Sequence, residues 1–133
     1  MATITSNPQD LYKRQRILTA SPVELIVLLY EGLKKFTVLA SRAVEKNDMA
    51  KAHANFIKAQ NVVSELMNSL DMSVPISEDL LRLYEFILHE LTEANIKKDT
   101  SKIPDVIEII DELCSAWQEI ADSQTGSMAA ANE

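Results

Sequence analysis

Apolar residues return every three or four positions along most of this chain, which is the period of helices that bury one face. The first such stretch begins after Ser21 and ends near Asn47. Its apolar stripe consists of Leu25, Leu29, Gly32, Phe36, Ala40 and Ala43, and it is widened by Ile26, Leu33 and Val44. We therefore predict a long helix over about residues 22–46, broad enough on its apolar side to touch more than one neighbour.

Three residues mark the start of this helix. Ser21 can accept a hydrogen bond from a free backbone N–H of the first turn, and Pro22 suits the first helical position because it has no N–H of its own. Glu24 follows three residues after Ser21, which is the spacing of a capping box. The start near residue 22 is thus predicted by local chemistry as well as by periodicity.

Three further periodic stretches predict helices over about residues 48–71, 77–99 and 102–121. Asp48 and Ser77 are the expected N-caps of the second and third helix. Pro75 should keep the segment before Ser77 out of helix, because its ring clashes with a helical backbone. Four helices joined by short connections predict an all-α fold, an antiparallel four-helix bundle over residues 21–121.

The two ends should lie outside this bundle. We expect residues 1–20 to form an N-terminal arm, with a short helix after Pro8 and with Leu11, Tyr12, Ile17 and Leu18 as its docking side chains. Residues 122–133 are small, polar and aperiodic, so we expect a disordered tail there.

Composition narrows the functional classes. A net charge of −7 argues against a nucleic-acid partner, since phosphate neutralisation needs clustered Lys and Arg. No apolar run approaches the roughly 18–20 residues that span a bilayer, and the polar start lacks the apolar core of a signal peptide. Cys114 is the single cysteine. We therefore expect a cytoplasmic protein without membrane insertion.

The sequence disfavours two catalytic classes. Glu85, His89 and Glu93 share one helical face, but a di-iron bundle needs Glu-x-x-His on two helices, and position 86 is Phe. A phosphotransfer histidine needs a nearby cation for the phosphate, and neither His53 nor His89 has one a turn away. Cys114 and Trp117 are best explained as buried or groove-lining residues. We predict no enzyme, no metal and no cofactor.

Other features favour a binding protein. Gly32 interrupts a strong helix at a cost of about 1 kcal/mol relative to Ala, which suggests the close approach of another segment. The chain is 47% hydrophobic, and several helices are apolar beyond one seam. Apolar surface left over on a bundle usually forms a partner groove or a dimer face, so we also consider a homodimer in the absence of a partner.

From about Asn7 to Ile120 the chain resembles the FliS family of flagellin export chaperones. The resemblance is carried by short segments in a specific order. These are Thr19-Ala-Ser-Pro22, Glu24-Leu25, Leu29-Tyr30-Glu-Gly32, Asn47-Asp48-Met49, Lys58-Ala-Gln-Asn61, Glu65-Leu66, Ser69-Leu-Asp71, Leu83-Tyr84, Leu91, Ala94-Asn95, and Asp99 through Val106 to Trp117.

The resemblance implies a cytoplasmic chaperone that binds the disordered C-terminal segment of flagellin, prevents its premature polymerisation and helps deliver it to the flagellar type III export apparatus. It also implies that the N-terminal arm covers part of the client groove when no client is bound. The family often has two tyrosines in this arm after an Asn-Pro pair. Here Tyr12 matches the second, but the first position is Gln9, so docking through that position should be weaker.

The expected client-binding residues are Tyr12, Ile17, Ile26, Leu29, Tyr30, Lys58, Gln60, Asn61 and Tyr84. Tyr30 and Tyr84 are expected to hydrogen-bond the client backbone, although helical geometry prevents the whole set from facing one way. The alternative function is a bundle adaptor that binds another amphipathic helix; a phosphotransfer or metal-binding bundle is the least favoured.

Overall fold

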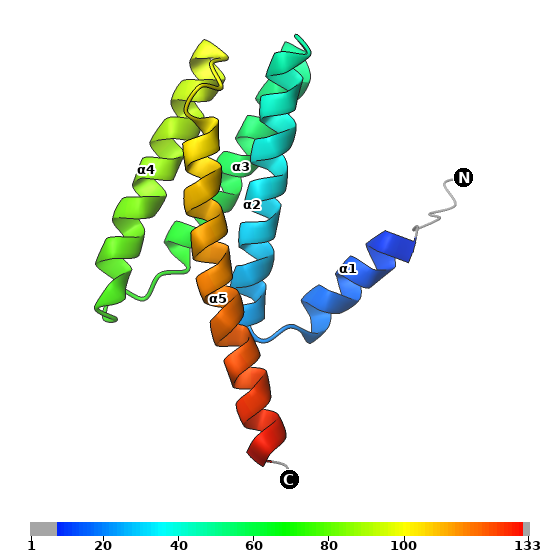
Figure 1. The fold of residues 1–133 in the computed structure, drawn as a ribbon, viewed down its shortest axis with the longest axis vertical. Coiled ribbons are helices and arrows are strands. Elements are labelled where there is room, and N and C mark those ends of the chain that lie inside the picture. Colours follow the sequence, from blue (N-terminus) through cyan, green and yellow to red (C-terminus); the bar gives the residue numbers. More distant parts are fainter. Residues whose placement is uncertain (1–7, 132–133) are drawn as a thin grey trace.

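The computed structural model describes residues 8–131, and within this range the chain is all-helical. The elements are α1 (Pro8–Thr19), α2 (Pro22–Glu45), α3 (Met49–Asn68), α4 (Ile76–Lys97) and α5 (Ile103–Ala131). Helices α2–α5 form an antiparallel bundle, and α1 projects from the end where α2 begins (Figure 1). The predicted fold class and the short helix after Pro8 are confirmed, while residues 1–7, with Asn7 of the Asn-Pro pair, lie outside the described range.

Two of the predicted helix starts have the expected caps. The Ser21 Oγ accepts a hydrogen bond from the Glu24 backbone N–H at 3.2 Å, and the Asp48 Oδ1 accepts one from the Lys51 N–H at 3.1 Å. Each satisfies a donor that the first helical turn leaves without a partner. Local chemistry therefore sets where α2 and α3 begin.

The predicted cap of α4 is wrong. Helix α4 begins at Ile76, one residue before Ser77, and Pro75 occupies the cap position without a side-chain hydrogen bond. Ser77 is buried, and its Oγ donates to the Asp71 carbonyl at 2.6 Å. A serine hydroxyl can bond either an N–H of its own helix or a carbonyl nearby, and burial beside the α3–α4 loop favours the second.

Helix α2 is the central element, because it packs along both α3 and α5. Its most buried residues are Tyr30, Leu33, Thr37 and Ala40, whereas Leu25 of the predicted stripe is 39% exposed. The buried side is thus rotated from the stripe that we predicted. A helix with two neighbours has a broad apolar surface, and periodicity alone cannot tell which part of it is the centre.

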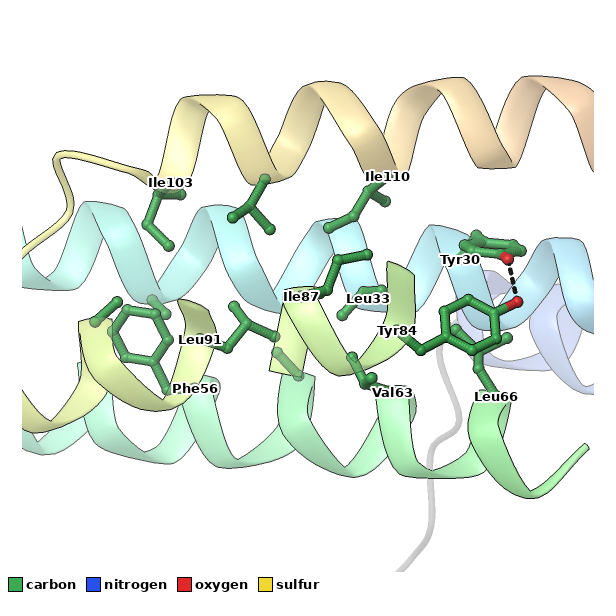
Figure 2. Close-up of a cluster of buried hydrophobic side chains, with 14 of the residues drawn as sticks. Tyr30, Leu33, Phe56, Val63, Leu66, Tyr84, Ile87, Leu91, Ile103 and Ile110 are labelled. Carbon is green, nitrogen blue, oxygen red and sulfur yellow. Dashed lines mark hydrogen bonds between the residues drawn. The ribbon is translucent and has the colours of Figure 1, made fainter. Parts of the chain in front are cut away.

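Two buried tyrosines join α2 to α4 across the core. Tyr30 and Tyr84 hydrogen-bond through their hydroxyls, with ring centroids 6.3 Å apart and planes tilted by 49° (Figure 2). Burial, followed by the hydrogen bond to Tyr84, raises the pKa of Tyr30 well above its ordinary value. Burial also raises the pKa of Tyr84. Both hydroxyls are therefore kept protonated in the folded protein.

Gly32 does not mark a tight helix crossing. A Cβ added at this position would meet nothing within 4 Å outside its own helix, and the residue is half-buried. No other segment of the described chain approaches Gly32 closely, so the bundle itself does not require glycine here, and the close approach of a partner segment stays a prediction.

Helices α4 and α5 meet near their connecting loop and diverge toward the other end (Figure 1). Lys98 ends α4 in the left-handed region at φ 50°, and Lys102 lies 4.0 Å from Glu90 across the loop.

At its C-terminal end, α5 continues past its predicted limit at residue 121 to Ala131. The predicted disordered tail is thus helical through residue 131, since no proline interrupts the stretch that continues α5; residues 132 and 133 lie outside the described range.

Within the range that the structure describes, we find no helix with the length and apolar character needed to span a bilayer.

We predict that Leu91→Ala lowers the free energy of unfolding by about 2–5 kcal/mol, because Leu91 is fully buried and its truncation leaves a cavity. Ile96→Ala on the same helix is the control, since Ile96 is 73% exposed and its truncation should cost less than about 0.5 kcal/mol. Urea denaturation followed by circular dichroism measures both. Equal losses would contradict the assignment of the core.

We predict that Tyr30→Phe and Tyr84→Phe each destabilise the bundle by about 1–3 kcal/mol, because each removes the hydrogen bond between two buried hydroxyls. The double variant should cost less than the sum, with a coupling energy of about 0.5–3 kcal/mol in a double-mutant cycle. Additive losses would show that the two hydroxyls do not interact.

The same pair predicts a pH dependence. In the unfolded chain tyrosine ionises near pH 10, about its ordinary pKa, whereas the folded pKa values of Tyr30 and Tyr84 are raised. Their contribution to stability is therefore constant below about pH 10 and falls as the pH rises further. Urea titrations at several pH values should show a smaller alkaline loss in the double Tyr→Phe variant than in the wild type.

Candidate partner-binding surface

A groove between α1 and α2 is the most apolar hollow that we find on the described part of the protein. We call it the α1–α2 groove; it has a volume of about 410 Å³ and is lined by Arg16, Ile17, Leu28, Glu31, Gly32, Lys35 and Phe36. Gly32 leaves the helix backbone bare at its centre, since a methyl group added there would meet nothing within 4 Å. A partner segment can therefore approach α2 more closely at Gly32 than over any residue with a side chain.

Charged side chains frame this groove. Arg16 Nη1 of α1 lies 3.4 Å from Glu31 Oε2 of α2, which ties the end of α1 to the bundle. Lys35 and Lys58 lie over the Phe36 ring, with their Nζ atoms 5.9 Å and 5.6 Å from its centroid. The groove thus offers an apolar floor, with two cations close to the ring of Phe36.

A second, smaller apolar pocket lies where α4 diverges from α5. It has a volume of about 190 Å³ and is lined by Ile26, Ser69, Leu70, Asp71, Val74, Ile76, Ser77, Leu80, Tyr84 and Trp117. The buried Tyr30–Tyr84 pair lies beside this pocket and Trp117 is half-buried at it. The two hollows lie on different sides of α2.

The structure separates the predicted client-binding residues into several groups. Ile17 lines the α1–α2 groove, and Lys58 contacts its Phe36. Ile26 and Tyr84 line the second pocket, and Leu29 is packed against the core. Tyr12 is 62% exposed on α1, with Arg16 over its ring at 5.8 Å.

Tyr30 and Tyr84 are not the surface hydrogen-bonding groups that we expected. Both are buried and their hydroxyls bond one another, because these positions face the bundle axis between α2 and α4. Tyr30→Ala would empty a fully buried position, so it would report on folding rather than on surface contacts.

The three polar residues of α3 point in different directions. Gln60 donates to the Thr92 hydroxyl of α4 at 3.2 Å, whereas Lys58 faces α2. Asn61 is exposed and lines an open hollow with Val62, Ser64, Glu65 and Asn68. A single segment cannot contact all three along one straight path.

Among the residues that line the groove, the sequence pattern predicted only Ile17 as a client contact. It missed Arg16, Leu28, Glu31, Gly32, Lys35 and Phe36 in that role. Leu28 lies four residues before Gly32, and Lys35 three after it, so all three share one side of α2. This row could have been found by asking which side of the helix Gly32 leaves bare.

The described residues contain no group of three or more His, Cys, Asp or Glu that could hold a metal ion. His89 and Glu93 line a polar hollow, but Glu93 is paired with Lys97 at 3.0 Å. Burial raises the pKa of the half-buried Cys114 thiol, which disfavours the thiolate form.

Proteins of similar sequence identify the family of this chain. The model of the family described as flagellar protein FliS matches residues 5–124. The chain is 35% identical over 118 residues to the flagellar secretion chaperone FliS of Bacillus subtilis (strain 168), covering 89% of each chain. It is 30% identical over 107 residues to that of Vibrio cholerae, covering 79% of each.

The fold has a relative among solved structures. A bacterial flagellar chaperone in a crystal structure superposes with a TM-score of 0.73, covering 88% of this chain and 99% of that one at 13% identity. At this identity the similarity concerns the fold alone. The family match over most of the chain, together with the relatives of similar length, shows that the protein belongs to the FliS family.

Proposed function

We propose that this protein is a cytoplasmic export chaperone that binds the C-terminal segment of newly made flagellin. It keeps the client from polymerising and helps deliver it to the flagellar type III export apparatus. Membership of a family whose relatives are named flagellar secretion chaperones supports this role. The α1–α2 groove is the structural observation that carries it.

The groove suits a client segment that becomes helical on binding. Amphipathic helices bind in apolar grooves through side chains spaced three or four residues apart. Leu28, Gly32 and Phe36 lie along one side of α2 at four-residue intervals, so they offer a continuous strip for such a helix. Gly32 would let a bulky client side chain reach the α2 backbone.

The conformational entropy that a disordered client loses on binding determines how much apolar contact area the chaperone must offer. A segment that folds on binding gives up conformational freedom, so tight binding needs a large apolar contact area. One groove of this size does not supply it alone. We infer that the client extends beyond the groove, and Leu29 and Ile26 on α2, with Asn61 on α3, remain proposed contacts.

Helix α1 is placed to regulate access to the groove. Ile17 forms one wall, and the Arg16–Glu31 ion pair holds this end of α1 near α2. This exposed ion pair is weak, since such pairs contribute about 1 kcal/mol or less. A client can therefore displace α1 at little cost. Gln9 and Tyr12 are exposed on the same helix, and Gln9 stands where the family often has the first of its two tyrosines.

We predict that Gly32→Leu leaves the bundle intact or stabilises it while weakening client binding about tenfold or more. The helix gains from replacing glycine by a good helix former, and a Cβ here meets nothing within 4 Å. The leucine side chain, however, fills part of the groove. Isothermal titration with a peptide of the flagellin C-terminal segment measures affinity, and thermal unfolding measures stability.

Two control variants separate groove blocking from general effects. Gly32→Ala makes the same helix gain with almost no added volume, so it should retain client affinity and raise stability by about 1 kcal/mol. Ala54→Leu adds an exposed leucine on α3, at a position that does not line the groove, and should change neither. Wild-type binding should show a large negative heat-capacity change. Full affinity in Gly32→Leu would overturn the assignment of the groove, and no wild-type binding by an intact bundle would overturn the proposed client.

A further inference from the structure

The charges of this protein are divided between its two halves. Helices α1–α3 contain five acidic and eight basic residues, a net of +3, whereas α4 and α5 contain eleven acidic and two basic, a net of −9. Between Ile103 and Ala131 there are six acidic residues and no Lys or Arg. The net charge of −7 is therefore distributed unevenly, and the excess of acidic residues lies on α4 and α5.

Helix α4 has a row of apolar side chains on the side that faces α5. Glu90 lies 4.0 Å from Lys102, the residue just before α5, so Glu90 is on the side of α4 that faces the beginning of α5. Phe86 lies four residues before Glu90 and Leu83 seven before it, so both lie on this side. Phe86 is 46% exposed and Leu83 is also exposed, because α4 has diverged from α5 at their level.

Helix α5 also has a row of apolar side chains on the side that faces α4. Trp117 shares a pocket with Leu80 and Tyr84 of α4, so this side of α5 faces α4. Leu113 lies four residues before Trp117 and Ile120 three after it, on the same side. Leu113 and Trp117 are half-buried, and Ile120 is exposed. We call Leu83, Phe86, Leu113, Trp117 and Ile120 the α4–α5 face.

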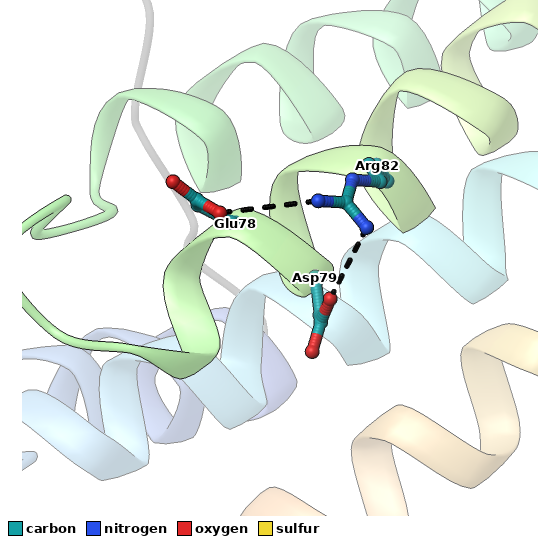
Figure 3. A network of polar contacts seen from close by, with 3 residues as sticks. All are labelled: Glu78, Asp79 and Arg82. Atoms are coloured by element: carbon teal, nitrogen blue, oxygen red, sulfur yellow. Dashed lines mark hydrogen bonds and ion pairs between the residues drawn. The ribbon is translucent and has the colours of Figure 1, made fainter.

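Acidic side chains border this face on both helices. On α4, Glu78 and Asp79 share one cation, Arg82, at 3.9 Å and 3.5 Å, so the three together keep a net negative charge (Figure 3). On α5, Glu112 and Glu119 are exposed and lie about 100° around the helix from Leu113 and Ile120, on the side away from Trp117, so they flank the apolar row rather than belong to it. The structure describes no cation paired with either of these glutamates.

We propose that the α4–α5 face is a second docking surface, which binds a basic amphipathic helix of a partner protein. The apolar stripe of that helix covers Phe86 and Trp117, and its flanking Lys and Arg side chains lie over the acidic borders. This surface is distinct from the α1–α2 groove and does not depend on the flagellin assignment. Charge complementarity selects the partner, since an acidic helix would meet like charges on both sides.

The test uses the full-length protein and two synthetic helical peptides of about 18 residues with identical leucine stripes, long enough to cover the face. One has lysine at every polar position, and the other has glutamate. Fluorescence anisotropy should show that the leucine–lysine helix binds at least about tenfold more tightly than the leucine–glutamate helix. Raising NaCl from about 50 to 500 mM should weaken that binding, since border charges are screened.

Matched variants locate the binding. Phe86→Ser should weaken binding of the leucine–lysine helix about tenfold, whereas Ile96→Ser, at an exposed apolar residue elsewhere on α4, should not. Glu112→Lys with Glu119→Lys should weaken it, whereas Glu24→Lys with Glu45→Lys, an equal charge change on α2, should not. Gly32→Leu should leave it unchanged, which separates this surface from the client groove.

Three results would overturn the proposal. Equal binding of the two peptides would remove the charge argument, and equal loss in Phe86→Ser and Ile96→Ser would show non-specific attraction to an acidic protein. The third is a dimer in analytical ultracentrifugation that Phe86→Ser dissociates, without binding of the leucine–lysine helix by the monomer. That result would identify a second copy of this chain as the occupant.

Discussion

The contact between Tyr30 and Tyr84 connects α2 to α4 at the level where α4 has begun to leave α5. Elsewhere α2 is held by long packing against α3 and α5, and α4 by packing against α3. Without the tyrosine pair, the open end of the α4–α5 seam would expose the bundle axis. Two large rings fill this space, and their hydroxyls satisfy one another, so polar atoms can lie in the core at little cost.

This arrangement leaves apolar surface on two sides of one central helix. On one side of α2, Gly32 opens a bare strip between Phe36 and Leu28 that α1 only partly covers. On the other, the divergence of α4 from α5 exposes Phe86 and Ile120. The surplus apolar residues in the sequence are therefore gathered into two separate surfaces, which suits a protein that binds extended or multiple helical segments.

The charges make these two surfaces unequal. The α1–α2 groove is bordered by Lys35, Lys58 and an ion-paired Arg16, whereas the α4–α5 face is bordered by exposed glutamates. Apolar contact provides affinity in both, but the sign of the border charges decides which helix each accepts. A single helix of uniform charge would fit only one of them.

The sequence alone predicts that the helices exist, where α2 and α3 begin, and to which family the chain belongs. It can do so because periodicity, capping and short motifs each depend on residues that lie close together in the chain. Ser21 and Asp48 cap as expected because each bonds an N–H only three residues away. Tertiary structure decided the rest. Tyr30 and Tyr84 lie 54 residues apart, and their motif membership suggested exposed client contacts until the bundle placed both at its axis. The sequence shows that Gly32 leaves the α2 backbone without a side chain at this position. Only the positions of α1 and Phe36 in the fold show that this position lies in a groove. Rotation of a helix about its own axis is set by its neighbours, and no local pattern contains that information.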